Sequence, residues 1–214
     1  MPDRPQPAYA NPKFARAYLR VSAKAEERGV REHRRALLAG LAGTVCEVGA
    51  GQGLNFAHYP NGVTRVLAVE PEPTLRSHAL DAAARAPIPV EVLDGAADAL
   101  PLDDASCNAV VTSLVLCTVP DLPDALAEVR RVLRPGGDLR FYEHVRSAHR
   151  PIAIAEDLVT PMWSRFAGGC HPNRDSVAAI TAAGFYVSSV DRFGFSPQRG
   201  VPRTAHVLGR ATRG

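Results

Sequence analysis

Three alternating glycines after a short apolar run constrain this chain more than any other stretch. The run 44–48 predicts a buried strand, and Gly49, Gly51 and Gly53 follow it in the pattern E-x-G-x-G-x-G. A strand, a glycine turn and a helix start form a site for a nucleotide-like ligand, because glycine removes the side chains between peptide and ligand. A dinucleotide fingerprint needs a further glycine where Leu54 stands, which disfavours a nicotinamide dehydrogenase. A purely structural turn is the alternative interpretation.

Apolar runs and helical patterns alternate along the first two thirds of the chain. Strands are predicted at 44–48, 64–70, 90–93, 108–116 and 138–145, with helices at 52–58, 73–85 and 121–134. This alternation predicts an α/β domain with a Rossmann-like, mostly parallel sheet and helices on both faces. Two further strands, 185–192 and 204–210, follow a helix that Asn173 is expected to cap. No helix separates them, so we expect a seven-stranded sheet with an antiparallel last strand.

The segments outside this alternation are expected to cover the site. Residues 1–12 contain four prolines and predict an irregular arm, and residues 13–41 predict two helices split near Gly29. We expect region 1–43 to supply lid helices over a 44–214 domain, with 146–172 as a substrate-covering insert. The chain of 214 residues suits one structural domain overall.

Composition and charge limit the classes of binding partner that we expect. The net charge is only +3, without a basic block, so we expect a small-molecule partner and no nucleic acid. The four cysteines lie far apart with no C-x-x-C pair, which predicts no metal site, no disulfide framework and a cytoplasmic location. The longest apolar run, Ala109–Val119, is well short of the roughly 20 residues that span a bilayer, so we expect a soluble protein without a transmembrane segment. The oligomeric state is left open.

Polar and small residues gather where the predicted strands end. Glu70 ends the second strand roughly 20 residues after the glycines, where a ribose-binding acid belongs, although a solvated loop acid is the alternative. The loop 94–101 after the third strand consists mainly of small residues and suits an adenine ring. Ser113 and Leu114 close the fourth strand at the same edge. Ligands of such sheets bind at this edge.

These segments together resemble the class I S-adenosylmethionine (SAM)-dependent methyltransferases over nearly the whole chain. The motifs are Glu47–Gly53, Glu70, Ala97–Pro101 and Glu128–Gly137. A narrower resemblance to the branch that contains the thiol S-methyltransferases rests on residues 55–60, 114–118, 143–145, 161–163, 169–170 and 206–209. Animal members of that branch carry a membrane-anchoring N-terminus. This chain has a proline arm and polar helices there, so the resemblance does not extend to membrane attachment.

The resemblance implies SAM as cofactor and S-adenosylhomocysteine as product. The implied cofactor-binding residues are Glu47, Gly49, Ala50, Gly51, Gly53, Asn55, Glu70, Pro71, Ala96, Ala97, Asp98, Ser113 and Leu114. Two positions depart from the family pattern. Ala96 replaces an acid that commonly holds the adenine amino group, and Asn108 replaces the aspartate that commonly starts strand four. Adenine recognition is then expected to use backbone groups and shape, with Asp98 or Asp94 as substitutes.

A sulfonium methyl group is already activated, so its transfer depends mainly on alignment with the acceptor. Positioning contributes about 7–11 kcal/mol, more than the roughly 10²–10⁴-fold of a general base. Glu143 and His144, at the end of strand five, are the candidate catalytic residues, with His171 next. Either histidine could instead be structural. Cys117 and Cys170 are not expected to act as nucleophiles, because methyl transfer needs no protein thiol.

The acceptor is expected to be small and fairly apolar. Tyr18, Trp163, Phe166 and His171 are the candidate substrate-binding residues. The alternative is that Tyr18 packs on the domain surface and that Trp163 and Phe166 belong to the core. Methylation of a thiol is the favoured hypothesis, slightly ahead of O- or N-methylation of a metabolite or lipid headgroup. A non-catalytic SAM-binding or partner-binding module is the alternative from another class.

Overall fold

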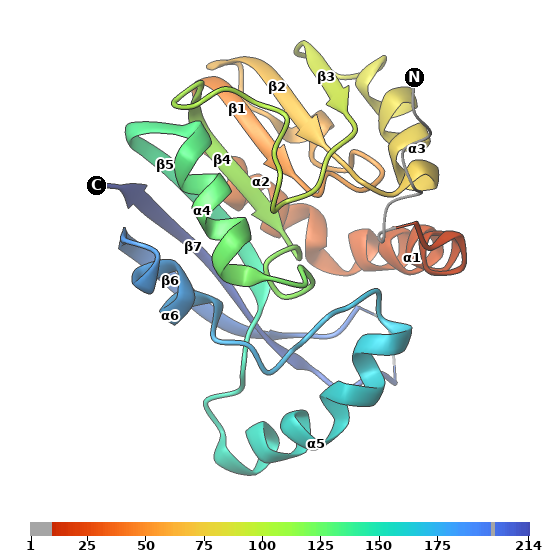
Figure 1. Cartoon of the computed structure of the whole chain (residues 1–214). Coiled ribbons are helices and arrows are strands. Elements are labelled where there is room, and N and C mark those ends of the chain that lie inside the picture. Colours follow the sequence, from red (N-terminus) through yellow and green to blue (C-terminus); the bar gives the residue numbers. More distant parts are fainter. Residues whose placement is uncertain (1–9, 198–199) are drawn as a thin grey trace, which may run out of the picture.

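The protein is described by a computed structural model over residues 10–197 and 200–214, so most of the expected arm at 1–12 lies outside the described residues. Seven strands form one sheet in the order β3-β2-β1-β4-β5-β7-β6 (Figure 1). β7 is antiparallel to both of its neighbours, whereas the pairs among β1 to β5 are parallel. The predicted fold class is therefore confirmed. The strands are β1 Gly43–Val48, β2 Val63–Val69, β3 Val90–Leu93, β4 Cys107–Ser113, β5 Leu133–His144, β6 Phe185–Phe195 and β7 Thr204–Arg213.

Helices cover both faces of the sheet. They are α1 Pro12–Ala25, α2 Arg31–Leu38, α3 Pro73–Ala83, α4 Leu122–Val132, α5 Arg150–Phe166 and α6 Ser176–Ala182, with short turns η1 Glu26–Val30 and η2 Phe56–His58. Figure 1 shows α4 in front of the sheet and α2 behind it. Leu37 and Leu38 of α2 and Ala79 of α3 belong to one buried cluster. Leu126 of α4 and Ile180 of α6 belong to the other, so two cores enclose the sheet.

The two N-terminal helices have different surroundings. Gly29, with φ +117°, lies in the η1 turn between them, so the predicted split near this residue is confirmed. α2 contributes Leu37 and Leu38 to the core, whereas α1 lies beside α3 and carries Tyr18 over the glycine turn. α2 is thus part of the domain core, and α1 is the N-terminal helix that contacts the glycine turn.

The helix predicted at 52–58 is wrong. The chain there makes a series of turns and then only the single 3₁₀ turn η2. Gly51 at φ +59° and Gly53 at φ +79° adopt left-handed backbone conformations, which a right-handed helix does not contain. The glycines that make the turn therefore also delay the helix.

The cap predicted for α6 is also wrong. Asp175 is the N-cap, and its carboxylate accepts the Ala178 N–H at 3.0 Å. Asn173 lies two residues earlier and donates its side-chain N–H to Asp157 Oδ1 at 3.1 Å. Asp121, by contrast, caps α4 as expected by accepting the Asp124 N–H at 3.0 Å. Both capping side chains satisfy a backbone donor that the first helical turn leaves unpaired.

The insert that follows β5 is mostly helical. α5 stands apart from the sheet beyond the carboxyl ends of the strands (Figure 1). It buries only Ala153 and Thr160. No helix in the described ranges 10–197 and 200–214 has both the length and the apolar character needed to cross a membrane.

Candidate active site

The glycine turn after β1 has a backbone that other residues would strain. Gly49, Gly51 and Gly53 all have positive φ, at +63°, +59° and +79°. A Cβ added at Gly49 would lie 2.6 Å from Val115 Cγ2, and one at Gly53 would lie 2.8 Å from Ala82 Cβ. The turn therefore requires glycine for its conformation and for its close contacts. Ala50 between them is buried, and its N–H donates to the Val69 carbonyl at 3.1 Å.

Glu70 lies directly after β2 and is bound to this turn. Its Oε2 accepts the Gly51 N–H at 2.7 Å, and its Oε1 accepts the Glu72 N–H at 2.9 Å. Burial raises the pKa of Glu70, against the lowering effect of these two N–H groups. Each carboxylate oxygen has a second lone pair, so the group retains capacity to accept ribose hydroxyls. Pro71 follows it, half-buried.

A buried polar network supports the turn from beneath. Glu47 accepts the Asn55 side-chain N–H at 2.9 Å and the Tyr59 hydroxyl at 2.7 Å. Arg34 donates to Asn55 Oδ1 at 3.0 Å and to Glu26 Oε1 at 2.8 Å. Burial raises the pKa of Glu47 to about 7 despite these hydrogen bonds. Sequence reasoning missed Arg34, because a lone arginine in a polar helix gives no signal of burial.

α1 closes the turn in this structure. The Tyr18 ring lies near Gly51, 3.6 Å from the place where a Cβ would stand, and Gln52 Nε2 donates to Ser22 Oγ at 3.0 Å. The cavity left between α1, the turn and Ser113 has a volume of only about 10 Å³. Sites for drug-sized ligands occupy roughly 300–1,000 Å³. A nucleoside therefore enters only if α1 or the turn moves.

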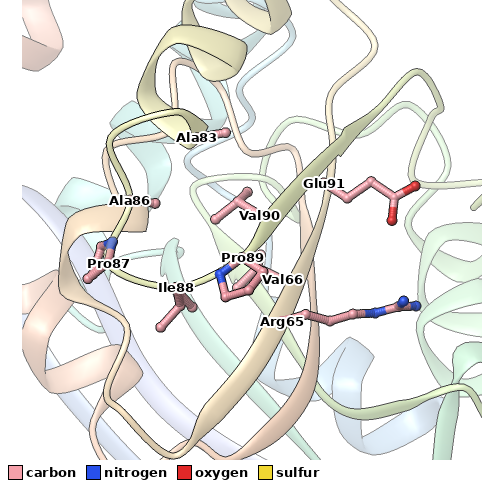
Figure 2. A pocket seen from close by; sticks show the side chains of 9 residues that line it. All are labelled: Arg65, Val66, Ala83, Ala86, Pro87, Ile88, Pro89, Val90 and Glu91. Carbon is pink, nitrogen blue, oxygen red and sulfur yellow. The ribbon is translucent and has the colours of Figure 1, made fainter.

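A larger pocket of about 560 Å³ lies at the opposite edge of the sheet. Figure 2 shows its lining of Arg65, Val66, Ala83, Ala86, Pro87, Ile88, Pro89, Val90 and Glu91. These residues belong to the amino-terminal halves of β2 and β3, to the end of α3 and to the loop before β3. Because α/β sheets bind ligands at the carboxyl ends of their strands, this pocket is on the wrong edge for the cofactor.

The loop after β3 is fastened by α4. Glu128 Oε2 accepts the Leu100 N–H at 2.8 Å, and Arg131 donates to the Leu100 and Leu102 carbonyls at 3.0 and 2.7 Å. The Glu128 and Arg131 side chains also pair with each other at 2.6 Å. Both come from the motif Glu128–Gly137, which spans the end of α4 and the start of β5, so that motif fixes the predicted adenine loop. Within this loop Ala96 and Ala97 are half-buried, and Asp98 is exposed.

Glu143 holds the loop that follows β4. Its carboxylate is fully buried and accepts the Val115 and Cys117 N–H groups, both at 3.2 Å. Burial raises the pKa of Glu143 against these backbone donors. Leu114 begins this loop with φ +61°, a strained value for leucine, and its N–H donates to the Tyr142 carbonyl at 2.7 Å. β5 thus fixes the segment that carries Cys117.

Two thiols and an imidazole meet beside this loop. Cys117 Sγ lies 3.6 Å and Cys170 Sγ 3.4 Å from His144 Nδ1, and the two sulfurs are 3.9 Å apart. Interaction with Cys117, and then with His144, lowers the pKa of Cys170. Sequence reasoning placed His144 near the site but did not associate the cysteines with it. Their separation along the chain hid the cluster.

Two of the predicted substrate residues of the insert, Trp163 and His171, interact with this cluster. Trp163 is 45% exposed and Phe166 79% exposed, which excludes the alternative that they are core residues. The Trp163 side chain interacts with the Cys170 thiol. His171 is half-buried, and its N–H donates to the Cys117 carbonyl at 2.7 Å. α5 therefore presents apolar surface next to a polar cluster.

A seven-stranded sheet with an antiparallel β7, a glycine turn after β1 and a buried acid after β2 defines the class of SAM-dependent methyltransferases. The residues suit SAM once α1 has moved, because the glycines of the turn contribute no side chains and Glu70 retains acceptor capacity. The family described as "Methyltransferase domain" matches residues 46–141. SAM is the cofactor of this enzyme.

Two curated relatives identify the family more closely. Human thiol S-methyltransferase TMT1B is 34% identical over 82% of this chain and 74% of its own length. The Rattus norvegicus protein of the same name is 32% identical over 79% of this chain and 70% of its own. The chain belongs to this family of methyltransferases.

Solved structures share the fold at lower identity. A SAM-dependent methyltransferase from Thermotoga maritima superposes with a TM-score of 0.71 at 22% identity, over 94% of this chain and 97% of its own. Geranyl diphosphate methyltransferase in complex with SAM gives 0.67 at 17% identity, over 90% of this chain and 85% of its own. At these identities the likeness concerns the fold alone.

Proposed function

We propose that this methyltransferase transfers the methyl group of SAM to the sulfur of a small, fairly apolar thiol. The observation that carries the proposal is the half-buried imidazole of His144 at the carboxyl end of β5, which has Cys170 as a common neighbour with exposed Trp163. An imidazole is a proton acceptor near neutral pH, and the indole offers an apolar wall. The names of the TMT1B relatives support sulfur as the attacking atom.

SAM supplies a methyl group that is already activated on a sulfonium sulfur. We assign its binding to the residues that surround the glycine turn and the loops after β2, β3 and β4: Glu47, Gly49, Ala50, Gly51, Gly53, Asn55, Glu70, Pro71, Ala96, Ala97, Asp98, Ser113 and Leu114. Arg34 extends this set. Its buried guanidinium lies beside the turn and suits the carboxylate of the cofactor's amino-acid part.

α1 acts as the lid of this site. Tyr18 covers Gly51, and the Gln52–Ser22 hydrogen bond holds the helix against the turn. The small cavity beneath it means that cofactor binding displaces α1 and that return of the helix excludes water. Water exclusion matters because it strengthens the electrostatic interactions that align the reactants.

The thiol of the acceptor must lose its proton to become a good nucleophile. A free thiol has a pKa of about 8.5, so only about 3% is thiolate at pH 7. We assign this proton to His144, the last residue of β5. Glu143 has a positioning role, because both of its oxygens accept backbone N–H groups of the loop that carries Cys117.

The insert supplies the apolar part of the acceptor site. α5 exposes a row of large apolar side chains: Ile152, Ile154, Leu158, Val159, Met162, Trp163 and Phe166. Burial of such a surface by an apolar acceptor contributes roughly 25 cal/mol per Å². His171 joins the insert to the loop after β4 through its backbone N–H.

A panel assay tests the proposal. Purified enzyme is incubated with methyl-labelled SAM and matched alkyl thiols, phenols and amines of equal size. We expect label in the thiols, and loss of most of it in His144→Ala, while calorimetric binding of S-adenosylhomocysteine is unchanged. Label in phenols or amines with none in any thiol would reject the thiol acceptor and favour O- or N-methylation.

A further inference from the structure

We propose that Cys117, His144 and Cys170 form a Zn²⁺ site with three protein ligands and an open fourth position that binds the acceptor thiol. The role of the fourth position rests on the proposed thiol acceptor, whereas the three-ligand site does not. The three ligand atoms come from the loop after β4, the end of β5 and the segment after α5.

The spacing of the three atoms matches a tetrahedral zinc centre. Zinc binds thiolate at about 2.3 Å and imidazole at about 2.0–2.1 Å, which places two sulfurs about 3.8 Å apart and sulfur and nitrogen about 3.6 Å apart. The observed separations are 3.9 Å between the sulfurs, and 3.6 and 3.4 Å from the sulfurs to His144 Nδ1. The atoms therefore need to move by only tenths of an ångström.

Hydrogen bonding, including that from Cys170 Sγ to Cys117 Sγ at 3.9 Å, does not use all three contacts at once. An imidazole nitrogen has one lone pair or one hydrogen, so Nδ1 pairs well with one of the two thiols. Cys117 and Cys170 nevertheless both approach it, and both are buried. A cation at the common point would use all three atoms at once.

The backbone holds each ligand in place. Glu143 accepts the Cys117 N–H at 3.2 Å, and the Cys117 carbonyl accepts the His171 N–H at 2.7 Å. Gly169 permits the close approach, since a Cβ there would lie 2.9 Å from the Thr118 carbonyl oxygen. Supporting contacts of this kind orient the ligands of metal sites.

The number of ligands indicates a reactive site. Structural zinc sites have four protein ligands, whereas catalytic sites have three and leave the fourth to water or substrate. Within the described part of the chain, three ligand atoms form this group. Trp163, which interacts with Cys170, is 45% exposed, so the cluster lies one side chain from solvent on the α5 side.

Zinc would replace the base role assigned above to His144, whose Nδ1 would bind the metal and accept no proton, because a coordinated thiol is deprotonated. The acceptor R–SH binds zinc and loses its proton to a base or to solvent. Its sulfur then forms a bond to the methyl carbon while the methyl–sulfonium bond breaks, and that electron pair returns to the cofactor sulfur. The products are R–S–CH₃, S-adenosylhomocysteine and H⁺, with no change in zinc and no oxidant.

Metal analysis tests the site without reference to activity. Protein produced with zinc supplied and purified under reducing conditions is measured by mass spectrometry for bound metal, and metal-free protein is titrated with Co²⁺. We expect about one zinc per chain and a thiolate-to-cobalt charge-transfer band. Cys170→Ser and His144→Ala should each lower metal affinity at least about 10-fold.

Two controls keep the test interpretable. Cys107→Ala removes a buried thiol outside the cluster and should keep its zinc. Binding of S-adenosylhomocysteine and the melting temperature show whether each variant is folded. Three results would each overturn the site. They are a folded wild type without bound zinc, zinc retained by both ligand variants, and a Cys117–Cys170 disulfide in protein isolated under reducing conditions.

Acceptor thiols then test the fourth position. An alkyl thiol added to the Co²⁺ protein should change the charge-transfer band, and an alcohol of equal size should not. A band that no thiol changes would overturn the open position. Thiol methylation at full rate by the zinc-free protein would overturn the inferred role of zinc but leave the proposed function intact. Methylation of only phenols or amines by the zinc-loaded protein would reject the proposed function but leave the three-ligand site.

Discussion

The carboxylate of Glu70 accepts the backbone N–H of Gly51 at 2.7 Å, which joins the end of β2 to the turn after β1. Hydrogen bonds to a charged group contribute about 1.5–3 kcal/mol, so the pairing fixes both the turn and the acid. The two parts of the expected cofactor site are thus one unit before any ligand binds.

Replacing this acid should weaken cofactor binding. We expect Glu70→Ala to raise the dissociation constant of S-adenosylhomocysteine about 10–100-fold, because it removes a charged acceptor of ribose hydroxyls. Isothermal titration calorimetry measures the effect, with exposed Glu91→Gln on β3 as the control. Unchanged affinity in folded Glu70→Ala would contradict the role of this residue.

Two glycine-to-alanine variants should separate the cost of backbone strain from the cost of a steric clash. Gly40→Ala meets nothing within 4 Å, so at φ +73° it should cost only the roughly 1–2 kcal/mol of a left-handed residue. Gly49→Ala has a similar φ and places its Cβ 2.6 Å from Val115 Cγ2, so its loss of unfolding free energy should be larger. Chemical denaturation compares the two variants. Equal losses would show that the turn has room for a side chain.

Stability should depend on pH through Glu47. Its pKa is about 7 in the folded protein against 4.5 for an ordinary glutamate, so folding takes up a proton between these values. The stability that Glu47 contributes is therefore complete below pH 4.5 and is lost as the pH rises through 7.

Glu47→Gln should abolish this loss. Relative to the wild type it should become more stable by up to about 3 kcal/mol between pH 5 and pH 8. Thermal unfolding at both values measures the change, and Glu91→Gln should show no such trend. If the difference in stability between the wild type and Glu47→Gln stays constant with pH, Glu47 is charged in both the folded and the unfolded state.

The lid should control the rate of cofactor entry. Tyr18→Ala removes the ring beside Gly51, so we expect faster association of S-adenosylhomocysteine in stopped-flow measurements. Leu80→Ala, at an exposed position on α3, is the control. An association rate that does not change in Tyr18→Ala would show that α1 is not the barrier.

The sequence predicts the sheet well, because buried parallel strands are short apolar runs and their parallel pairing follows from the alternation with helices. The position of Glu70 after β2 is confirmed for the same reason, since Pro71 ends the run. The helix predicted at 52–58 fails because Gly51 and Gly53 adopt left-handed conformations that composition alone does not reveal.

The cysteine cluster could not be predicted from spacing. Cys117 and Cys170 lie 27 and 26 residues from His144, on separate loops that only the fold brings together. Metal motifs are recognised when ligands lie close in sequence, and these do not. Arg34 was missed for a related reason, because its partner Asn55 lies 21 residues away on the turn.

The most direct test of this account is a crystal structure with S-adenosylhomocysteine bound. We expect the ligand to contact the glycine turn and Glu70 after α1 has moved, with its sulfur directed toward the side where His144 lies and its adenine on the loop after β3. A ligand in the pocket of Figure 2, or one whose sulfur points away from His144, would contradict it.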